Sequence, residues 1–150
     1  MKLLAQNHSF ATARCSDFID LTDDVLELVE QSGIANGVAV VFSPHTTGAI
    51  IINERERGFI ADFHEMVGRL VPDEDEYRHD DTESRVENLD DTDHTVPNGH
   101  AHCRHALLGS ASQSVPVIDG RLQLGRWQRV FFVECDRARD RRVLIQVLGE

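Results

Sequence analysis

The chain has 150 residues, 41% of them hydrophobic, and a formal net charge of −11. This length and composition fit one globular domain, which would bury roughly 68–70% of the surface of its unfolded chain. The acidic charge argues against nucleic acid as a partner, since phosphate binding needs clustered Lys and Arg, and no apolar run approaches the ~20 residues that span a membrane.

The first third of the sequence predicts one helix and two strands. Residues 21–33 fit a short helix, with Thr22 as its N-cap and Gly33 where a glycine commonly ends a helix. Residues 37–42 and 47–53 are rich in β-branched side chains and flank a Ser-Pro pair, so we expect two strands there.

An amphipathic helix is expected next, over residues 55–70. Its apolar residues recur with the spacing of one helical face, and we expect them to pack in the core: Phe59, Ile60, Phe63, Met66, Val67 and Leu70. Residues 73–93 carry eleven acids against two arginines, which predicts a solvated loop. A short helix should follow, with Asn98 as its N-cap and Gly109 at its end.

The last third of the sequence is typical of β-structure. Residues 114–125 fit a hairpin with Asp119-Gly120 at the turn, where positive φ must be accepted. Two further strands are expected over 127–135 and 142–149. Because strands occupy both flanks and helices lie between them, the predicted fold class is α+β. We expect a single compact domain over residues 1–150, built mostly of antiparallel β-sheets with a few helices.

Half of the eight histidines lie within twelve residues, in the stretch HTVPNGHAHCRH from His94 to His105. His102 and His105 are three apart and can share a helical face, which gives at most two ligands of one metal from this helix. A closed structural metal site built from this stretch alone is therefore disfavoured. Distant residues would have to complete a site.

Two more histidines have polar neighbours. His45 follows Pro44 and leads into the second predicted strand, and His79 lies in the acidic segment beside Asp80. On the residues alone, plainer explanations are favoured for both. His45 would satisfy backbone groups in a turn, and His79 would be one more polar residue of a solvated loop.

The strand at 127–135 places a carboxylate and an amide among apolar residues. Period-two alternation puts Gln128 and Glu134 on the same face as Val130 and Phe132. A buried carboxylate without a partner is costly, so Glu134 needs one. The two explanations are a polar wall of a functional site and a salt bridge to an arginine of the final strand.

The cysteines and cations bear on the environment of the protein. Cys15, Cys103 and Cys135 form no CxxC pair, so we expect no disulfide framework and three small buried thiols. Lys2 is the only lysine beside fourteen arginines. An acidic, lysine-poor surface is typical of proteins from a salt-rich cytoplasm. The N-terminus has no sustained apolar core of a signal peptide, which favours a cytoplasmic location.

The order of several motifs resembles the YjbQ-like family, whose members are often labelled secondary thiamine-phosphate synthases. The motifs are PHTTGAIIINE, YRHDD, NGHAHCRHALLGSAS, and the run from VPVIDGRLQLGRWQ to the C-terminus. The resemblance extends from roughly residue 10 to the end of the chain. It implies a compact α+β fold, a homotrimer, and a metal-associated cleft lined by histidines.

Carried over by motif, the resemblance also implies a set of site residues. The metal ligands would be His45, His79 and His102. Catalytic roles fall on Glu54, Asp62 and Arg139. Substrate binding falls on Thr47, Asn53 and Gln128. The other clustered histidines have no such counterparts and are expected on loop and helix surfaces, with His100 nearest the cleft: His94, His100 and His105.

Two segments depart from the family pattern. Residues 53–59 read NERERGF and lack the Asp-Pro element of the family, and residues 136–139 read DRAR in place of Asp-Gly-Pro-Arg. Both changes bear on substrate contacts. They favour a protein that binds its ligand without turnover.

The family activity joins hydroxymethylpyrimidine diphosphate to a thiazole phosphate and releases pyrophosphate. The resemblance therefore implies a metal-assisted transferase that takes a small phosphorylated metabolite. Zn²⁺ is the expected ion, because neutral imidazoles suit it, with Mg²⁺ or Mn²⁺ as alternatives. Two other functions stay open: a metal-dependent phosphoester hydrolase, and a non-enzymatic trimeric protein that binds metal or a phosphorylated ligand.

Overall fold

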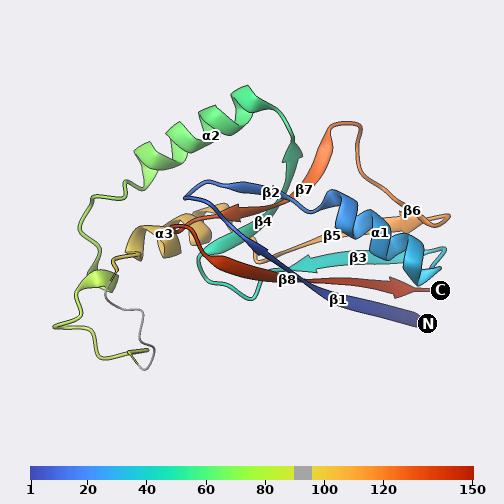
Figure 1. Ribbon diagram of the computed structural model, residues 1–150, viewed down its shortest axis with the longest axis horizontal. Helices are drawn as coiled ribbons and strands as arrows, with labels where there is room; N and C mark the ends of the chain where they lie inside the picture. Colours follow the sequence, from blue (N-terminus) through green and yellow to red (C-terminus); the bar gives the residue numbers. More distant parts are fainter. Residues whose placement is uncertain (90–95) are drawn as a thin grey trace.

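Residues 1–89 and 96–150 are described by the computed structural model, in which eight strands form two antiparallel sheets (Figure 1). The larger sheet has the order β1-β8-β3-β5-β6, with strands β1 (Lys2–Ala11), β8 (Asp140–Gly149), β3 (Gly37–Phe42), β5 (Ser112–Ile118) and β6 (Arg121–Leu122). The smaller sheet has the order β2-β7-β4, with strands β2 (Phe18–Asp20), β7 (Gln128–Glu134) and β4 (Gly48–Glu54). The expectation of an α+β domain with antiparallel sheets is confirmed.

Three α-helices and one 3₁₀ helix complete the described part of the chain: α1 (Thr22–Ser32), α2 (Arg57–Leu70), α3 (Gly99–Leu108) and η1 (Arg78–Asp80). Figure 1 shows α2 and the segment after it projecting at one end, near α3. None of the helices described here is long and apolar enough to cross a membrane.

The main core lies between the two sheets and beneath α1. One face of β7 contributes Val130 and Phe132 to this core. The other face contributes Phe131 and Val133, which pack with Phe63 of α2. The alternation predicted for this strand is therefore confirmed, and β7 is buried on both faces.

The ends of α1 show one correct and one wrong prediction. Gly33 ends the helix with φ 57°, a left-handed conformation that glycine adopts without strain. Thr22, however, is the first helical residue, and Leu21 occupies the N-cap position without a side-chain hydrogen bond. The Thr22 hydroxyl instead accepts a hydrogen bond from the Val130 N–H at 2.9 Å, so it ties α1 to β7.

Helix α2 begins two residues later than expected. The Glu56 carboxylate caps it by accepting hydrogen bonds from the N–H groups of Gly58 and Phe59, each at 2.7 Å. The expected core packing is wrong for Met66 and Leu70, which are 42% and 61% exposed. Helix α2 covers only the outer face of the three-stranded sheet, so its apolar stripe extends beyond the surface it can bury.

Positive φ values occur where the sequence places turn residues. The β5–β6 turn has φ 51° at Asp119 and 70° at Gly120, as the hairpin prediction requires. Helix α3 ends at Gly109 with φ 68°. Both of these predicted chain reversals are confirmed.

The cysteines do not all behave as small buried thiols. Cys135 is buried, and burial raises the pKa of its thiol to about 12. Cys15 is only partly buried, and Cys103 is exposed. The expectation is therefore wrong for Cys103, whose side chain on α3 is exposed to solvent.

The acidic segment is a loop, as expected, over its described residues 73–89, and η1 is its single helical turn there. Its last residues, 90–93, and His94 lie outside the described residues. Several side chains of this loop line the candidate site, which a purely solvated connection would not do.

Candidate functional site

A cleft of about 640 Å³ opens where four segments meet: the turn before β4, the loop that contains η1, the first turn of α3, and the connection between β7 and β8. Five of the nine expected site residues line it: His45, Thr47, His79, His102 and Arg139. Arg85 and Arg141 also line it, and neither was among the expected site residues. The fold therefore brings segments far apart in sequence to one cationic, histidine-lined cleft.

The other four expected site residues lie elsewhere. Asn53 and Glu54 end β4, where Glu54 pairs with Gln128 of β7, and all three are exposed. The start and end of this seven-residue strand are about 20 Å apart at the usual rise per strand residue. Asp62 is exposed on α2. Within one chain, neither expected catalytic carboxylate reaches the cleft.

His45 and Thr47 lie in the turn before β4, which begins at Gly48, one residue later than expected. These two residues therefore precede the strand and lie outside its alternation of faces. The imidazole Nε2 of His45 lies 3.2 Å from the backbone N of Arg142 and 3.1 Å from its carbonyl oxygen. Thr47 is buried, and its hydroxyl oxygen accepts a hydrogen bond from Arg141 at 2.9 Å. Both residues support the wall formed by β8.

His79 and His102 form a pair across the other side of the cleft. Their ring centroids are 4.3 Å apart, and the rings are tilted by 47°. The Asp80 carboxylate holds the two elements together by accepting hydrogen bonds from the N–H groups of Asn98 and Gly99, at 2.8 and 2.9 Å. Since His79 flanks Asp80 and His102 lies in the first turn of α3, these bonds fix the imidazole pair.

Two of the three histidines have lowered pKa values. Burial is the main cause for His102, and the neighbouring His79 and the positive charge of Arg85 lower the pKa of this imidazole further. Burial, followed by the positive charge of Arg141, lowers the pKa of His45. Both imidazoles are therefore neutral at neutral pH, and each can donate one hydrogen bond and accept another.

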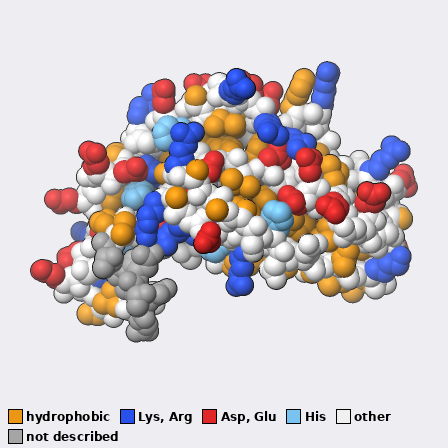
Figure 2. All heavy atoms as spheres, in the orientation of Figure 1, with side chains coloured by type: hydrophobic (Ala, Val, Ile, Leu, Met, Phe, Trp, Pro, Cys, Tyr) orange, Lys and Arg blue, Asp and Glu red, His pale blue; other side chains and the backbone are white. Residues whose placement is uncertain are grey.

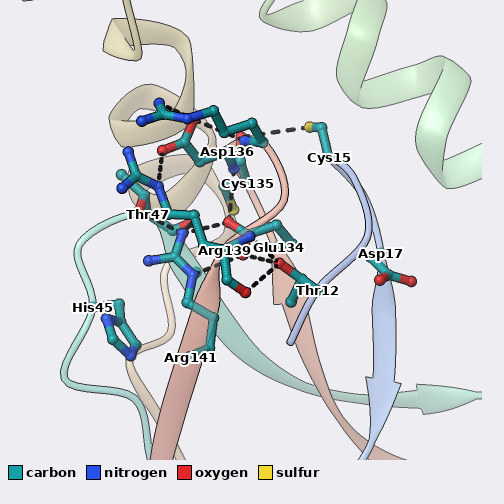
Figure 3. A network of polar contacts seen from close by, with 12 residues as sticks. Thr12, Cys15, Asp17, His45, Thr47, Glu134, Cys135, Asp136, Arg139 and Arg141 are labelled. Atoms are coloured by element: carbon teal, nitrogen blue, oxygen red, sulfur yellow. Dashed lines mark hydrogen bonds and ion pairs between the residues drawn. The ribbon is translucent and has the colours of Figure 1, made fainter. Parts of the chain in front are cut away.

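Arg141 lies at the base of the cleft in a buried ion pair (Figure 3). Its Nε and Nη2 atoms donate to the two carboxylate oxygens of Glu134, which is fully buried. Glu134 also accepts hydrogen bonds from the Thr12 hydroxyl and from the backbone N of Asp136. The partner of Glu134 is thus an arginine of the final strand, one of the two explanations that the sequence left open.

The DRAR connection between β7 and β8 keeps an arginine at the cleft without the Gly-Pro pair of the family. Arg139 Nε donates to the buried Asp136 carboxylate at 2.6 Å. The backbone of Arg139 is held by Thr12, whose hydroxyl oxygen accepts from the Arg139 N–H at 3.0 Å. Burial acts to raise the pKa of Asp136, but hydrogen bonds from Arg137 and Arg139 outweigh it and lower the pKa. The connection is therefore well anchored despite its altered sequence.

The three expected metal ligands do not form a metal centre within one chain. Over residues 1–89 and 96–150, no group of three or more His, Cys, Asp and Glu side chains is arranged to hold an ion. Arg85 Nη1 lies 3.2 Å from Nε2 of His79, and His45 Nε2 faces the backbone of Arg142. The Arg85 cation beside Nε2 of His79 would repel a metal ion, and the backbone of Arg142 occupies Nε2 of His45. These two imidazoles are therefore poorly placed to bind the divalent ion that the resemblance implies.

The remaining histidines of α3 face away from the cleft. His100 packs against Tyr77, with ring centroids 6.2 Å apart, and lies 3.9 Å from Asp73. His105 was expected on the helix surface, but its Nδ1 lies 3.1 Å from the carbonyl oxygen of Gly48. It therefore joins α3 to the start of β4, which places His102 opposite the turn that holds His45.

Three cleft contributors were not found from the sequence: Asp80 as a helix cap, Arg85 and Arg141. The sequence pattern could have indicated Arg141, because it shares the inward-facing parity of β8 with Val143, Ile145 and Val147. A charged residue at such a position needs a buried partner. Arg85 had no comparable signal, since it lies in a loop without periodicity.

A protein-family comparison shows what this chain resembles. The family model described as "UPF0047 protein YjbQ-like" matches residues 6–150. A UPF0047 protein of Methanothermobacter thermautotrophicus is 39% identical over 150 residues, which cover 100% of this chain and 95% of the relative. A UPF0047 protein of Archaeoglobus fulgidus is 41% identical over 137 residues, covering 91% and 95% of the two chains.

Solved structures show the same likeness. A YbjQ-like protein of unknown function from Sulfolobus solfataricus P2 superposes with a TM-score of 0.84 at 35% identity, covering 99% of each chain. A hypothetical protein from Aeropyrum pernix K1 gives a TM-score of 0.75 at 35% identity, covering 97% of this chain and 99% of the other. The likeness therefore extends over nearly the whole fold, including the elements that build the cleft.

Proposed function

The chain belongs to the UPF0047 YjbQ-like family, and from this premise we propose that its cleft binds a small phosphorylated metabolite and acts as a transferase of the secondary thiamine-phosphate synthase type. The observation that carries the proposal is the convergence of His45, His79 and His102 with Arg139 and Arg141 on one cleft. Guanidinium groups and imidazole N–H groups are well suited to bind phosphate oxygens.

The proposed reaction makes specific demands on the cleft. The thiazole ring nitrogen attacks the methylene carbon of hydroxymethylpyrimidine diphosphate, so that a C–N bond forms. The C–O bond to the diphosphate breaks, and pyrophosphate leaves with the bonding electrons. Negative charge therefore develops on the leaving group. Arginine side chains and the N–H of neutral His102 are the groups of this chain that can stabilise that charge.

The cofactor and the assembly are proposed from the family resemblance. Zn²⁺ stays a prediction from the family resemblance, and we assign no step to it, because the described donors of one chain do not form a metal site. A homotrimer is likewise what the resemblance implies. In such an assembly a neighbouring copy is the means by which exposed residues, such as Glu54 or Asp62, can approach a cleft.

A second candidate is a protein that binds a phosphorylated ligand without turnover. The position of Glu54 and Asp62 favours it, because both expected catalytic carboxylates lie outside the cleft in one chain. The two candidates share the ligand class and differ only in whether product forms.

The test is an assay of purified protein with both precursors, in which thiamine phosphate is separated by chromatography and quantified by fluorescence. We expect product with the unaltered chain, and about a hundredfold less with His102→Ala, the usual cost of losing one donor to a developing anion. His64→Ala is the control, since His64 is exposed on α2 and does not line the cleft. A parallel series with chelator and with added Zn²⁺, Mg²⁺ or Mn²⁺ tests the cofactor.

The two candidates give different outcomes in this assay. If neither precursor is consumed with any of the ions, the transferase proposal is wrong. Calorimetric binding of the precursors without product would then identify the ligand-binding protein.

A further inference from the structure

Arg85 is held in the loop after η1 almost entirely by neutral partners. Its guanidinium donates to three backbone carbonyl oxygens, those of His79 at 3.0 Å, Glu87 at 3.0 Å and Asn88 at 3.2 Å. Its Nη1 also lies 3.2 Å from Nε2 of His79. Because arginine can only donate, Nε2 of His79 is the acceptor of this bond.

Among residues 1–89 and 96–150, no carboxylate balances the charge of Arg85, unlike the charges of the other two cleft arginines. Arg141 pairs with Glu134, and Arg139 pairs with Asp136. In the described part of the chain, no Asp or Glu side chain forms an ion pair with Arg85, although it lies in an acidic segment. Within the described residues, it is therefore the cleft arginine whose positive charge is available to an anion.

The hydrogen-bonding geometry leaves this arginine able to bind as well as attract. A guanidinium group has five N–H donors, and the four contacts to His79, Glu87 and Asn88 leave one N–H, on Nη2. The backbone contacts fix the side chain in place, so little rotamer entropy remains to be lost when a ligand binds. Arg85 is partly buried and lines the cleft together with Asn88.

We infer that Arg85 forms the phosphate-recognition end of the cleft and binds the terminal phosphate of the substrate. This inference rests on the proposed phosphorylated ligand, and it adds that the loop of residues 78–88 is an arm of the site. The ligand then contacts Arg85 and the adjacent imidazole pair of His79 and His102, which together form one wall of the cleft. A diphosphate ester is the favoured class, because its two phosphate groups together carry more negative charge than a single phosphate monoester.

The experiment measures the affinity of the purified chain for inorganic pyrophosphate by calorimetry at low ionic strength. We expect Arg85→Ala to weaken binding by about tenfold or more, the effect of removing a charged hydrogen-bonding partner. Arg78→Ala is the matched control. It removes the same charge from the same loop, but Arg78 is exposed and does not line the cleft, so its affinity should stay within about twofold of the unaltered chain.

Arg85→Lys separates charge from loop structure. Lysine keeps the charge but cannot make the forked contacts to three carbonyl groups. If the charge acts on the ligand, Arg85→Lys retains most of the affinity that Arg85→Ala loses. If Arg85 only holds the loop, the two variants weaken binding equally, and the inference is wrong.

The remaining outcomes distinguish this inference from the proposed function. If Arg85→Ala binds pyrophosphate as tightly as the unaltered chain, the role of Arg85 is wrong while the phosphorylated ligand stands. If the unaltered chain does not bind pyrophosphate at all, both fail. If binding depends on Arg85 but no thiamine phosphate forms, the transferase reaction fails and the role of Arg85 stands.

Discussion

At the scale of single residues, the pair of Glu134 and Arg141 shows how a buried charge can be made acceptable and useful. Both Glu134 oxygens receive hydrogen bonds, from Arg141, the Thr12 hydroxyl and the Asp136 N–H. Such complete pairing offsets the cost of removing the carboxylate from water. The pair also fixes Arg141 at the base of the cleft, so a stability feature and a binding feature share the same atoms.

This arrangement predicts an asymmetric effect of mutation. Glu134→Ala should lower the free energy of unfolding by about 3–5 kcal/mol, because it leaves the Arg141 guanidinium buried without a counter-charge. The double variant Glu134→Leu/Arg141→Met removes both charges and should be markedly more stable than Glu134→Ala. Urea unfolding followed by circular dichroism measures the stability of the unaltered chain and of the two variants.

Glu65→Ala is the control for this series, because Glu65 is exposed on α2 and should change stability by less than about 0.5 kcal/mol. A loss below about 1 kcal/mol in Glu134→Ala would show that water reaches Arg141 and that the pair is not truly buried.

At the scale of elements, Asp80 joins η1 to α3 across the chain. Its Oδ1 accepts hydrogen bonds from the backbone N–H groups of Asn98 and Gly99, at the start of α3. The side chain of Asn98, the N-cap residue, makes no capping hydrogen bond, so Asp80 supplies the cap. A Cβ at Gly99 would overlap Tyr77, so the close approach also requires a glycine there. The spacing of the imidazole pair thus depends on this helix cap.

Asp80→Ala should therefore affect both stability and the site. We expect a loss of about 1 kcal/mol in the free energy of unfolding, the usual effect of removing a capping side chain, together with weaker pyrophosphate binding. Asp81→Ala is the control, since Asp81 caps only its own turn by accepting from Glu83 and Ser84. Equal effects of the two variants on pyrophosphate binding would contradict a special role for Asp80.

The elements also show what the sequence could and could not predict. Helix ends at Gly33 and Gly109 and the alternation in β7 follow from local patterns, and these predictions were correct. Strands β1 and β2 escaped prediction. β1 is an edge strand with a weak pattern of burial, and its ten residues are specified by pairing with β8 at the other end of the chain.

The site divides in the same way. The family resemblance singled out His45, His79 and His102, and the fold places all three on one cleft. Arg85 and the helix-capping role of Asp80 could not be identified, because they depend on contacts within an aperiodic loop or with distant backbone groups. Glu54 and Asp62 were expected in the site from the family resemblance, but neither lines the cleft within one chain.

At the scale of the whole molecule, a cationic cleft lies in a strongly acidic protein. Figure 2 shows acidic side chains spread widely over the visible face, and the chain carries 26 acids against 15 bases. The long-range field therefore repels an anionic ligand, and attraction must come from arginines in direct contact with it. This contrast explains why a single uncompensated side chain such as Arg85 can have a large effect.

The same excess of negative charge predicts that salt stabilises the fold. The compact state gathers a net charge of −11, so self-repulsion is larger in the folded chain than in the expanded one. Raising KCl from about 0.1 M to about 1 M shortens the Debye length from ≈ 10 to ≈ 3 Å. Exposed ion pairs weaken under the same screening, but each contributes little, so repulsion should dominate and Tm should rise.

Differential scanning calorimetry across this range tests the prediction. The control is the triple variant Glu74→Gln/Asp75→Asn/Glu76→Gln, which removes three exposed acids from the loop after α2. Since it carries less net charge, its Tm should rise less steeply with KCl than that of the unaltered chain. Equal slopes would mean that salt acts by strengthening apolar burial instead of by screening. A Tm that falls with KCl would show that the ion pairs, among them Asp20 with Arg129, outweigh the repulsion of the excess acids.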